Sequence, residues 1–204
     1  MLIVCLDLEG VLVPEIWVEV ARRSGIAALA RTTREEPDYD KLMRARLALL
    51  AGHGLKLADL QQAIAGMAPL EGARAFLDGL RERFQVVILS DTFYEFARPL
   101  MAQLGWPALF CHRLETDAAG FVSGYRLRMP DQKRAAVNAF RSLNFGVIAA
   151  GDSFNDTAML GAAHAGIFFR PPAAIAAQFP QHPVTQTYGE LAAAIARAAA
   201  GVAP

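Results

Sequence analysis

Three short, mostly apolar runs, each followed by polar residues, constrain the fold of this chain more than any other feature of its sequence. They are Leu2–Leu6, Gln85–Leu89 and Gly146–Ala150. Runs of this length without regular polar alternation are typical of parallel strands that are covered on both faces. A segment with helical periodicity follows each run, so we expect an α/β fold with a doubly wound parallel sheet and right-handed crossovers.

Polar side chains lie where each predicted strand ends. Asp7 and Glu9 follow the first strand, Ser90 follows the second, and Asp152 follows the third. The carboxyl ends of the strands in such a sheet share one edge, and ligands bind beyond that edge. We therefore expect these four side chains to belong to one site.

The stretch between the first two strands, residues 7–84, is far longer than one crossover helix needs. Most of it has helical periodicity rather than turn chemistry. Three helices are expected in it: Ile16–Ser24, Tyr39–Ala51 and Leu57–Met67. We interpret residues 14–71 as a helical cap, inserted into an α/β core that consists of residues 1–13 and 72–204.

Two smaller elements complete the prediction. Turn residues at Asp117 to Gly120, with apolar flanks, indicate a small hairpin within Leu114–Leu127. The alanine-rich stretch Gly189–Ala200 is expected to form a surface helix.

Composition narrows the classes of partner. Lys plus Arg number 20 and Asp plus Glu number 20, so the chain lacks the basic excess that nucleic acid requires. No apolar run approaches the length of about 20 residues that spans a membrane, and the N-terminus lacks the basic start of a secretory signal. We expect a cytoplasmic protein that binds neither nucleic acid nor membrane. A mean hydropathy of +0.26 is high for a soluble monomer, so a homodimer stays open.

The two carboxylates of Asp7-Leu-Glu9 are two residues apart just past a strand, so both can point to one side. Such a pair alone means little, because acidic pairs are common on surfaces. Here it is accompanied by Ser90, by Lys133 near a helix start, and by Gly151-Asp-Ser-Phe-Asn-Asp156 after the third strand. Phosphoryl transfer requires this combination of an in-line nucleophile, positive charge and aligned donors.

In this order along the chain, the four motifs resemble those of the haloacid dehalogenase-like phosphatase superfamily, and the resemblance covers essentially all 204 residues. It implies a Rossmann-type core with a helical cap, Mg²⁺ as cofactor, and a transient aspartyl-phosphate formed on Asp7. The resemblance further implies that Asp7, Asp152 and the backbone carbonyl of Glu9 bind the metal. Asp156 would support the metal site through water or hydrogen bonds.

The same resemblance assigns roles around the phosphate. Ser90 and Lys133 would hold its oxygens, and Lys133 would also neutralise the charge on Asp7. Glu9 would protonate the leaving alkoxide and then deprotonate the incoming hydroxyl. The superfamily usually has Asp at this second position, and the extra methylene of Glu9 moves the acid by about one bond length, a displacement that can matter for proton transfer.

Residues of the cap indicate the substrate. Glu15 and Arg44 resemble the cap residues of phosphoserine phosphatases, in which a Glu holds the ammonium of the substrate and an Arg its carboxylate. The chemistry agrees, because Arg presents a bidentate fork to a carboxylate. Arg46 points to another face of the helix and is the weaker candidate.

Asp91 and Thr92 follow Ser90 where phosphoserine phosphatases usually carry two glycines. With this departure, the chain resembles a narrower branch, the phosphoserine phosphatase/homoserine phosphotransferase family. The resemblance implies that the phosphoryl group passes from phosphoserine to water or to homoserine. It also implies that Asp91, Thr92 and Asn155 belong to the segments that bind substrate.

Two alternatives stay open at this point. The chain could be a superfamily phosphatase for another small phosphomonoester, in which Glu15 and Arg44 have no role with the substrate. It could also be a phospho-accepting receiver domain, since these also carry an acidic cluster and a Lys on a parallel sheet. The receiver alternative fits badly, because the receiver acceptor Asp lies later in the chain and a simple receiver has no cap.

Overall fold

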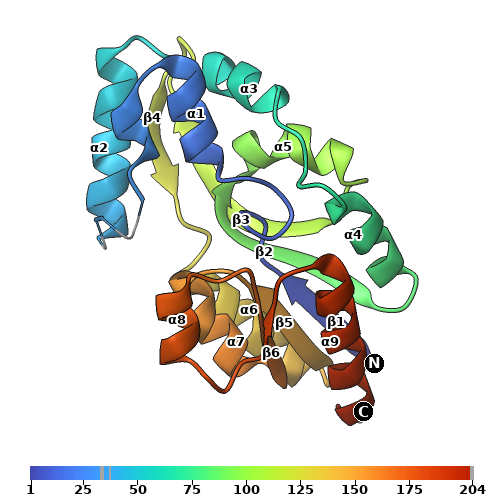
Figure 1. Cartoon of the computed structure of the whole chain (residues 1–204). Coiled ribbons are helices and arrows are strands. Elements are labelled where there is room, and N and C mark those ends of the chain that lie inside the picture. The colour runs from blue at the N-terminus through green and yellow to red at the C-terminus, as the bar shows by residue number, and fades with distance from the viewer. Residues whose placement is uncertain (33–34, 37, 203–204) are drawn as a thin grey trace.

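A seven-stranded sheet forms the centre of the computed structural model, which describes residues 1–32, 35–36 and 38–202 (Figure 1). Its order is β4-β3-β2-β1-β5-β6-β7. The strands are β1 (Leu2–Leu6), β2 (Gln85–Phe93), β3 (Ala108–Thr116), β4 (Val122–Arg126), β5 (Gly146–Gly151), β6 (Ala165–Phe169) and β7 (Val184–Thr185). Neighbouring strands are parallel except β3 and β4, which form the expected antiparallel hairpin.

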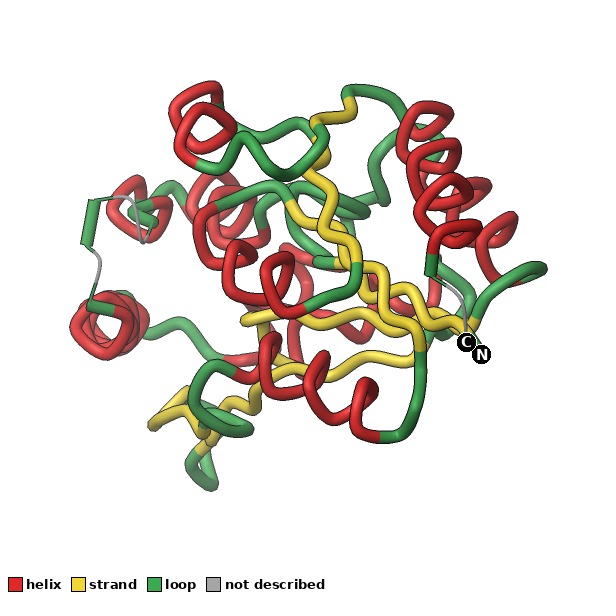
Figure 2. Tube along the Cα trace, turned by 90° about the horizontal axis from the view of Figure 1, so that it is seen from below, coloured by secondary structure: helices red, strands yellow, loops and turns green. Residues whose placement is uncertain are grey.

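Helices cover both faces of this sheet (Figure 2). One face carries α4 (Ala73–Arg81), α5 (Tyr94–Gln103) and α9 (Tyr188–Gly201), and the other carries α6 (Gln132–Ser142), α7 (Thr157–Ala162) and α8 (Ala173–Gln178). Side chains of β1 alternate between the two apolar cores, with Val4 and Leu6 in one and Ile3 and Cys5 in the other. The continuous apolar run arises because both faces are buried, and the predicted α/β class is confirmed.

A helical insertion between β1 and α4 lies above the core in Figure 1. It contains α1 (Ile16–Ser24), the 3₁₀ helix η1 (Ala27–Ala30), α2 (Tyr39–Gly52) and α3 (Leu57–Ala65). The three helices expected from the sequence are present within two residues of their predicted ends. The cap boundaries at 14 and 71 stay a prediction. No helix among the described residues is long and apolar enough to cross a membrane.

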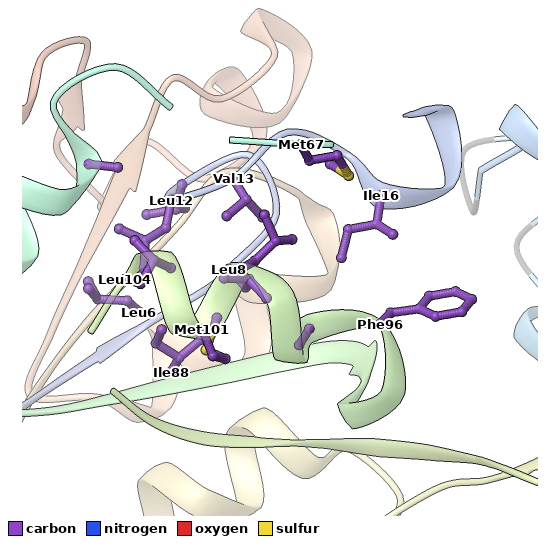
Figure 3. Packing of buried hydrophobic residues seen from close by; sticks show 14 of the residues in the cluster. Leu6, Leu8, Leu12, Val13, Ile16, Met67, Ile88, Phe96, Met101 and Leu104 are labelled. Carbon is purple, nitrogen blue, oxygen red and sulfur yellow. The ribbon is translucent and has the colours of Figure 1, made fainter. Parts of the chain in front are cut away.

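The loop after β1 is buried in the larger apolar core (Figure 3). Leu8, Leu12 and Val13 are fully buried, and they pack in the same cluster as Ile16 and Phe96. Burial of one such side chain stabilises the fold by roughly 1.5–3 kcal/mol. The loop folds back on itself, because the Leu12 and Val13 amides both donate to the Leu8 carbonyl, at 2.8 and 3.0 Å. The segment that carries Asp7 is therefore held rigidly.

Candidate functional site

Asp7 directly follows β1 at the carboxyl edge of the sheet. Its backbone N–H donates to the Ala150 carbonyl at 2.9 Å, which ties it to β5. Its carboxylate Oδ1 accepts from the Leu8 N–H at 2.7 Å and lies 2.9 Å from the Lys133 Nζ. The side chain is 4% exposed, so one edge of a buried carboxylate is fixed in place.

Lys133 is the cation at the centre of the site. Its Nζ lies 2.9 Å from Asp7 Oδ1, 2.8 Å from Asp156 Oδ1 and 3.8 Å from Asp91 Oδ2. Burial opposes the charged ammonium, but Asp156, Asp7 and Asp91 outweigh it and hold the pKa of Lys133 well above its usual value. The ammonium is therefore charged at neutral pH and lies beside the Asp7 carboxylate.

Asp7, Asp152 and Asp156 form a buried acidic cluster whose oxygens lie within 4.8 Å of one another. Burial raises the pKa of Asp7 well above its usual value, and the charges of Asp156 and Asp152 add to the rise, although Lys133 opposes it. Three carboxylates next to one ammonium leave an excess of negative charge. Oxygen ligands of this kind suit a hard divalent cation such as Mg²⁺, so the residues present fit the expected metal.

The loop after β5 orients two of these acids. Asp156 Oδ2 accepts from the backbone N–H groups of Asp152 and Ser153, at 3.0 and 3.1 Å. Two positions that lie against these acids require glycine. A Cβ at Gly10, whose φ is +76°, would overlap the Asp152 carboxylate, and a Cβ at Gly151 would overlap that of Asp156.

Glu9 is half-buried, and its Oε1 accepts from the Ile16 N–H at the start of α1, at 2.7 Å. Burial raises the pKa of Glu9 to about 7, with a further contribution from the charge of Glu15. A carboxyl with this pKa can give and take a proton near neutral pH, which is what the proposed acid and base role requires.

Ser90 and Thr92 are nearly fully buried at the end of β2. The Thr92 N–H donates to Ser90 Oγ at 3.3 Å. Because Leu6 pairs with Ile88, the ends of β1 and β2 that carry Asp7 and Ser90 lie side by side. The structure thus brings the first two motifs together.

Arg44 lies away from this cluster. Its side chain is 77% exposed and pairs with Asp40 on the same helix, Nε to Oδ2 at 2.7 Å. The structure shows that α2 turns the Arg44 side chain outward, and its predicted role with the substrate stays a prediction.

Arg46 is the buried arginine of α2, at 6% exposure. Its guanidinium lies over the Trp17 ring, 4.4 Å from the centroid, and its Nη2 donates to the Arg31 carbonyl at 2.7 Å. Its buried Nε has no hydrogen-bond partner in the described part of the chain. Burial lowers the pKa of Arg46 to about 10, and the nearby charges of Glu9 and Glu15 oppose that decrease. Glu15 itself is exposed, at the N-cap of α1.

Comparison with known proteins decides the family. A model described as haloacid dehalogenase-like hydrolase matches residues 1–164. The chain belongs to the haloacid dehalogenase-like hydrolase family. This assignment excludes the receiver-domain alternative.

Relatives of this hydrolase cover nearly its whole length. It is 61% identical over 189 residues to a Pseudomonas aeruginosa protein named phosphoserine phosphatase ThrH, with 93% of this chain and 92% of that protein covered. It is 60% identical over 189 residues to a phosphoserine phosphatase of Pseudomonas syringae pv. tomato, with 93% and 80% covered. Among solved structures, the phosphoserine phosphatase from T. onnurineus in complex with NDSB-201 superposes with a TM-score of 0.75 at 25% identity, covering 95% of this chain and 94% of that one.

Gln132 is a residue of this hydrolase that sequence reasoning missed. It is 2% exposed, and its Nε2 donates to the Ser90 carbonyl at 2.7 Å. It thereby ties the residue before Lys133 to the end of β2. Its position inside Pro130-Asp-Gln-Lys133 was the only signal in the sequence, and a polar residue next to a helix start is too common to stand out.

Proposed function

We propose that this hydrolase is a Mg²⁺-dependent phosphoserine phosphatase that forms an aspartyl-phosphate on Asp7 and passes the phosphoryl group to water or to homoserine. The observation that supports it most is the Asp7 carboxylate held beside the Lys133 ammonium and the Asp156 carboxylate at the sheet edge. The substrate is inferred from the relatives named phosphoserine phosphatases.

The residues of the core have complementary tasks in this proposal. Asp7 attacks phosphorus and displaces the serine oxygen, while Lys133 and Ser90 hold the phosphoryl oxygens. Glu9 gives its proton to the departing serine oxygen. The same side chain, now a carboxylate, then takes the proton from the water or homoserine hydroxyl that attacks the aspartyl-phosphate.

The acidic cluster would hold the metal. Asp7, Asp152 and the backbone carbonyl of Glu9 would be its protein ligands, and Asp156 would orient them. When bound, Mg²⁺ supplies positive charge that offsets the repulsion between these carboxylates and a phosphate dianion.

Arg46 and Glu15 would recognise the amino-acid part of the substrate. A buried guanidinium with a free Nε suits the carboxylate, and an exposed Glu15 close to it suits the ammonium. The serine part of phosphoserine and homoserine carry the same two groups, and their side chains differ by one methylene. One pair of residues would therefore serve the donor first and the acceptor afterwards.

The test is release of phosphate from L-phosphoserine with and without Mg²⁺, with homoserine added in a parallel reaction. We expect Mg²⁺-dependent turnover that Asp7→Asn abolishes, and phosphohomoserine in the parallel reaction. Release of phosphate without formation of phosphohomoserine would support the phosphatase activity and contradict the transfer to homoserine.

The alternative substrate class has its own outcome. If phosphoserine is inert while an aryl phosphate is cleaved, the chain is a phosphatase for another small phosphomonoester. The roles of Arg46 and Glu15 would then be wrong.

A further inference from the structure

The carboxylate of Asp91, at the end of β2, is surrounded by donors. Gln132 Nε2 donates to Oδ1 at 3.2 Å, and His112 Nε2 lies 3.6 Å from the same oxygen. Asn155 Nδ2 donates to Oδ2 at 3.0 Å, and Lys133 Nζ lies 3.8 Å from that oxygen. Four donors thus face the two oxygens of one carboxylate.

Two hydrogen bonds orient the Asp91 carboxylate, one from Gln132 to Oδ1 and one from Asn155 to Oδ2. His112 Nε2 and Lys133 Nζ lie beyond hydrogen-bond distance, at 3.6 and 3.8 Å, where the charge of Lys133 still acts on the carboxylate. The Asp91 side chain is 35% exposed, and its direct contact with substrate stays a prediction drawn from the sequence.

The donors come from separate segments that carry the catalytic groups. Gln132 and Lys133 begin α6, Asn155 lies in the 3₁₀ helix η2 (Phe154–Asp156), and His112 belongs to β3. Asp91 is the point at which these segments meet β2. A displacement of its carboxylate would remove the hydrogen bond from Asn155 and one of the three negative charges around the Lys133 ammonium.

We propose that Asp91 is a positioning residue, which holds the Lys133 ammonium against Asp7 and fixes the loop that carries Asp152 and Asp156. The proposal rests on the proposed function for the identity of the nucleophile. It concerns transfer of the phosphoryl group rather than recognition of the amino-acid part.

His112 is the neighbour of Asp91 that belongs to β3. It is buried, and its Nδ1 accepts from the Arg128 N–H at 3.0 Å, so the ring hydrogen of a neutral His112 resides on Nε2. That nitrogen points at Asp91 Oδ1. The rings of Tyr39 and Phe93 pack against the imidazole, with centroids 6.4 and 6.3 Å away, and limit its movement.

Asp91→Asn tests the proposal, because an amide has the same shape but only one acceptor oxygen for two pairs of donors. We expect kcat to fall about tenfold or more and KM to change by less than about threefold, since a shift of Lys133 affects the transfer step more than binding. Asp78→Asn, which removes a surface acid on α4, is the matched control. Phosphoserine and an aryl phosphate are both assayed, with thermal unfolding for each variant.

The outcomes separate the proposal from its rivals. A large rise in KM with unchanged kcat would mean that Asp91 binds substrate, and unchanged kcat and KM would mean that it does nothing in catalysis; either result overturns the proposal. If phosphoserine is inert with the wild type, the proposed function fails. The aryl phosphate still decides the role of Asp91, because Asp7 and Lys133 act on the phosphoryl group whichever substrate carries it.

If Asp91→Asn fails to fold, two variants of His112 test the same proposal. His112→Gln can place an amide N–H near the former Nε2 and keep the donor to Asp91. His112→Asn can accept from the Arg128 N–H but does not reach Asp91. We expect kcat of the Gln variant within about threefold of the wild type and that of the Asn variant about tenfold lower, at similar melting temperatures. The reverse order would show that His112 only anchors the backbone, and it would overturn the proposal.

Discussion

Glu9 and Asp91 are both carboxylates on which the charge of Lys133 acts, yet their surroundings shift their pKa values in opposite directions. Burial and Glu15 raise the pKa of Glu9 to about 7. Burial also opposes the charged form of Asp91, but Lys133 and the side-chain donors outweigh it and hold its pKa below its usual range. Glu9 can therefore exchange a proton at neutral pH while Asp91 stays charged, which matches a proton-transfer role for one and a positioning role for the other.

Glu9→Gln should lower phosphoserine turnover by about 10²- to 10⁴-fold, because neither proton transfer is then assisted. An aryl phosphate has a leaving group that needs no acid. We therefore expect a rapid burst of phenol followed by slow turnover, measured by stopped-flow absorbance. Full loss of the burst would contradict the role of Glu9 as the acid.

The same group sets a pH dependence. The acid form of Glu9 disappears as pH rises through its pKa of about 7. The rate constant for forming the aspartyl-phosphate from phosphoserine should therefore decline above that pH. Rapid-quench measurements across the pH range check this directly. In Glu9→Gln this decline should be absent. If the decline persists in that variant, another group causes it.

Arg46→Lys keeps a positive charge but loses the planar fork. We expect KM for phosphoserine to rise about 10- to 100-fold, since hydrogen bonds to charged groups contribute about 1.5–3 kcal/mol. The aryl phosphate, which has no carboxylate, should be little affected. Arg44→Lys, on the exposed face of the same helix, is the matched control and should behave as the wild type. Equal effects of the two variants would refute the assignment.

At the scale of the element, the helices of the cap could be predicted almost to the residue, but the inward face of α2 could not. Apolar residues occur on several sides of that helix, so periodicity alone does not identify its buried face. They are Leu42, Met43, Leu47, Leu49 and Leu50. Arg46 is in phase with Met43 and Leu50, which are buried, but the resemblance to a family indicates a residue type and not a helix face. The packing of α2 against Trp17 shows which of the two arginines is buried.

The loop between β1 and α1 provides a prediction at the same scale. Gly10→Ala adds a Cβ that overlaps Asp152 and strains a φ of +76°, whereas Gly25→Ala, at a φ of +72°, meets nothing within 4 Å. Both variants should lose about 1 kcal/mol of unfolding free energy through the backbone alone. We expect only Gly10→Ala to lose Mg²⁺ affinity in addition, measured by titration calorimetry. Equal Mg²⁺ affinity in the two variants would show that Asp152 is not a ligand.

At the scale of the whole molecule, the parallel sheet and the shared edge for Asp7, Ser90 and Asp152 could be predicted from three apolar runs. The fit of the cap to the core could not, because it depends on single contacts between distant segments. Tyr39 Oη donates to the Asp91 carbonyl at 3.3 Å, and Gln61 Nε2 donates to the Glu95 carbonyl at 3.0 Å. Such bonds leave no periodic signal in the sequence. The cytoplasmic location and the homodimer stay predictions.

Repulsion within the acidic cluster predicts a global effect of the metal. Mg²⁺ at about 100 times its dissociation constant should stabilise the fold by about 2.7 kcal/mol if it binds only the folded state. Differential scanning calorimetry should therefore show a melting temperature that rises with Mg²⁺ concentration. The rise should be reduced in Asp152→Asn, and a rise of the same size in that variant would place the metal elsewhere.

The central claim is that Asp7 carries the phosphoryl group, and rapid acid quench of the enzyme with radiolabelled phosphoserine and Mg²⁺ tests it most directly. We predict protein-bound label that hydroxylamine releases, as expected for an acyl phosphate, and borohydride reduction followed by peptide mass spectrometry should convert Asp7 alone to homoserine. Label on another residue, or turnover with no bound label at any quench time together with full activity of Asp7→Asn, would contradict the account.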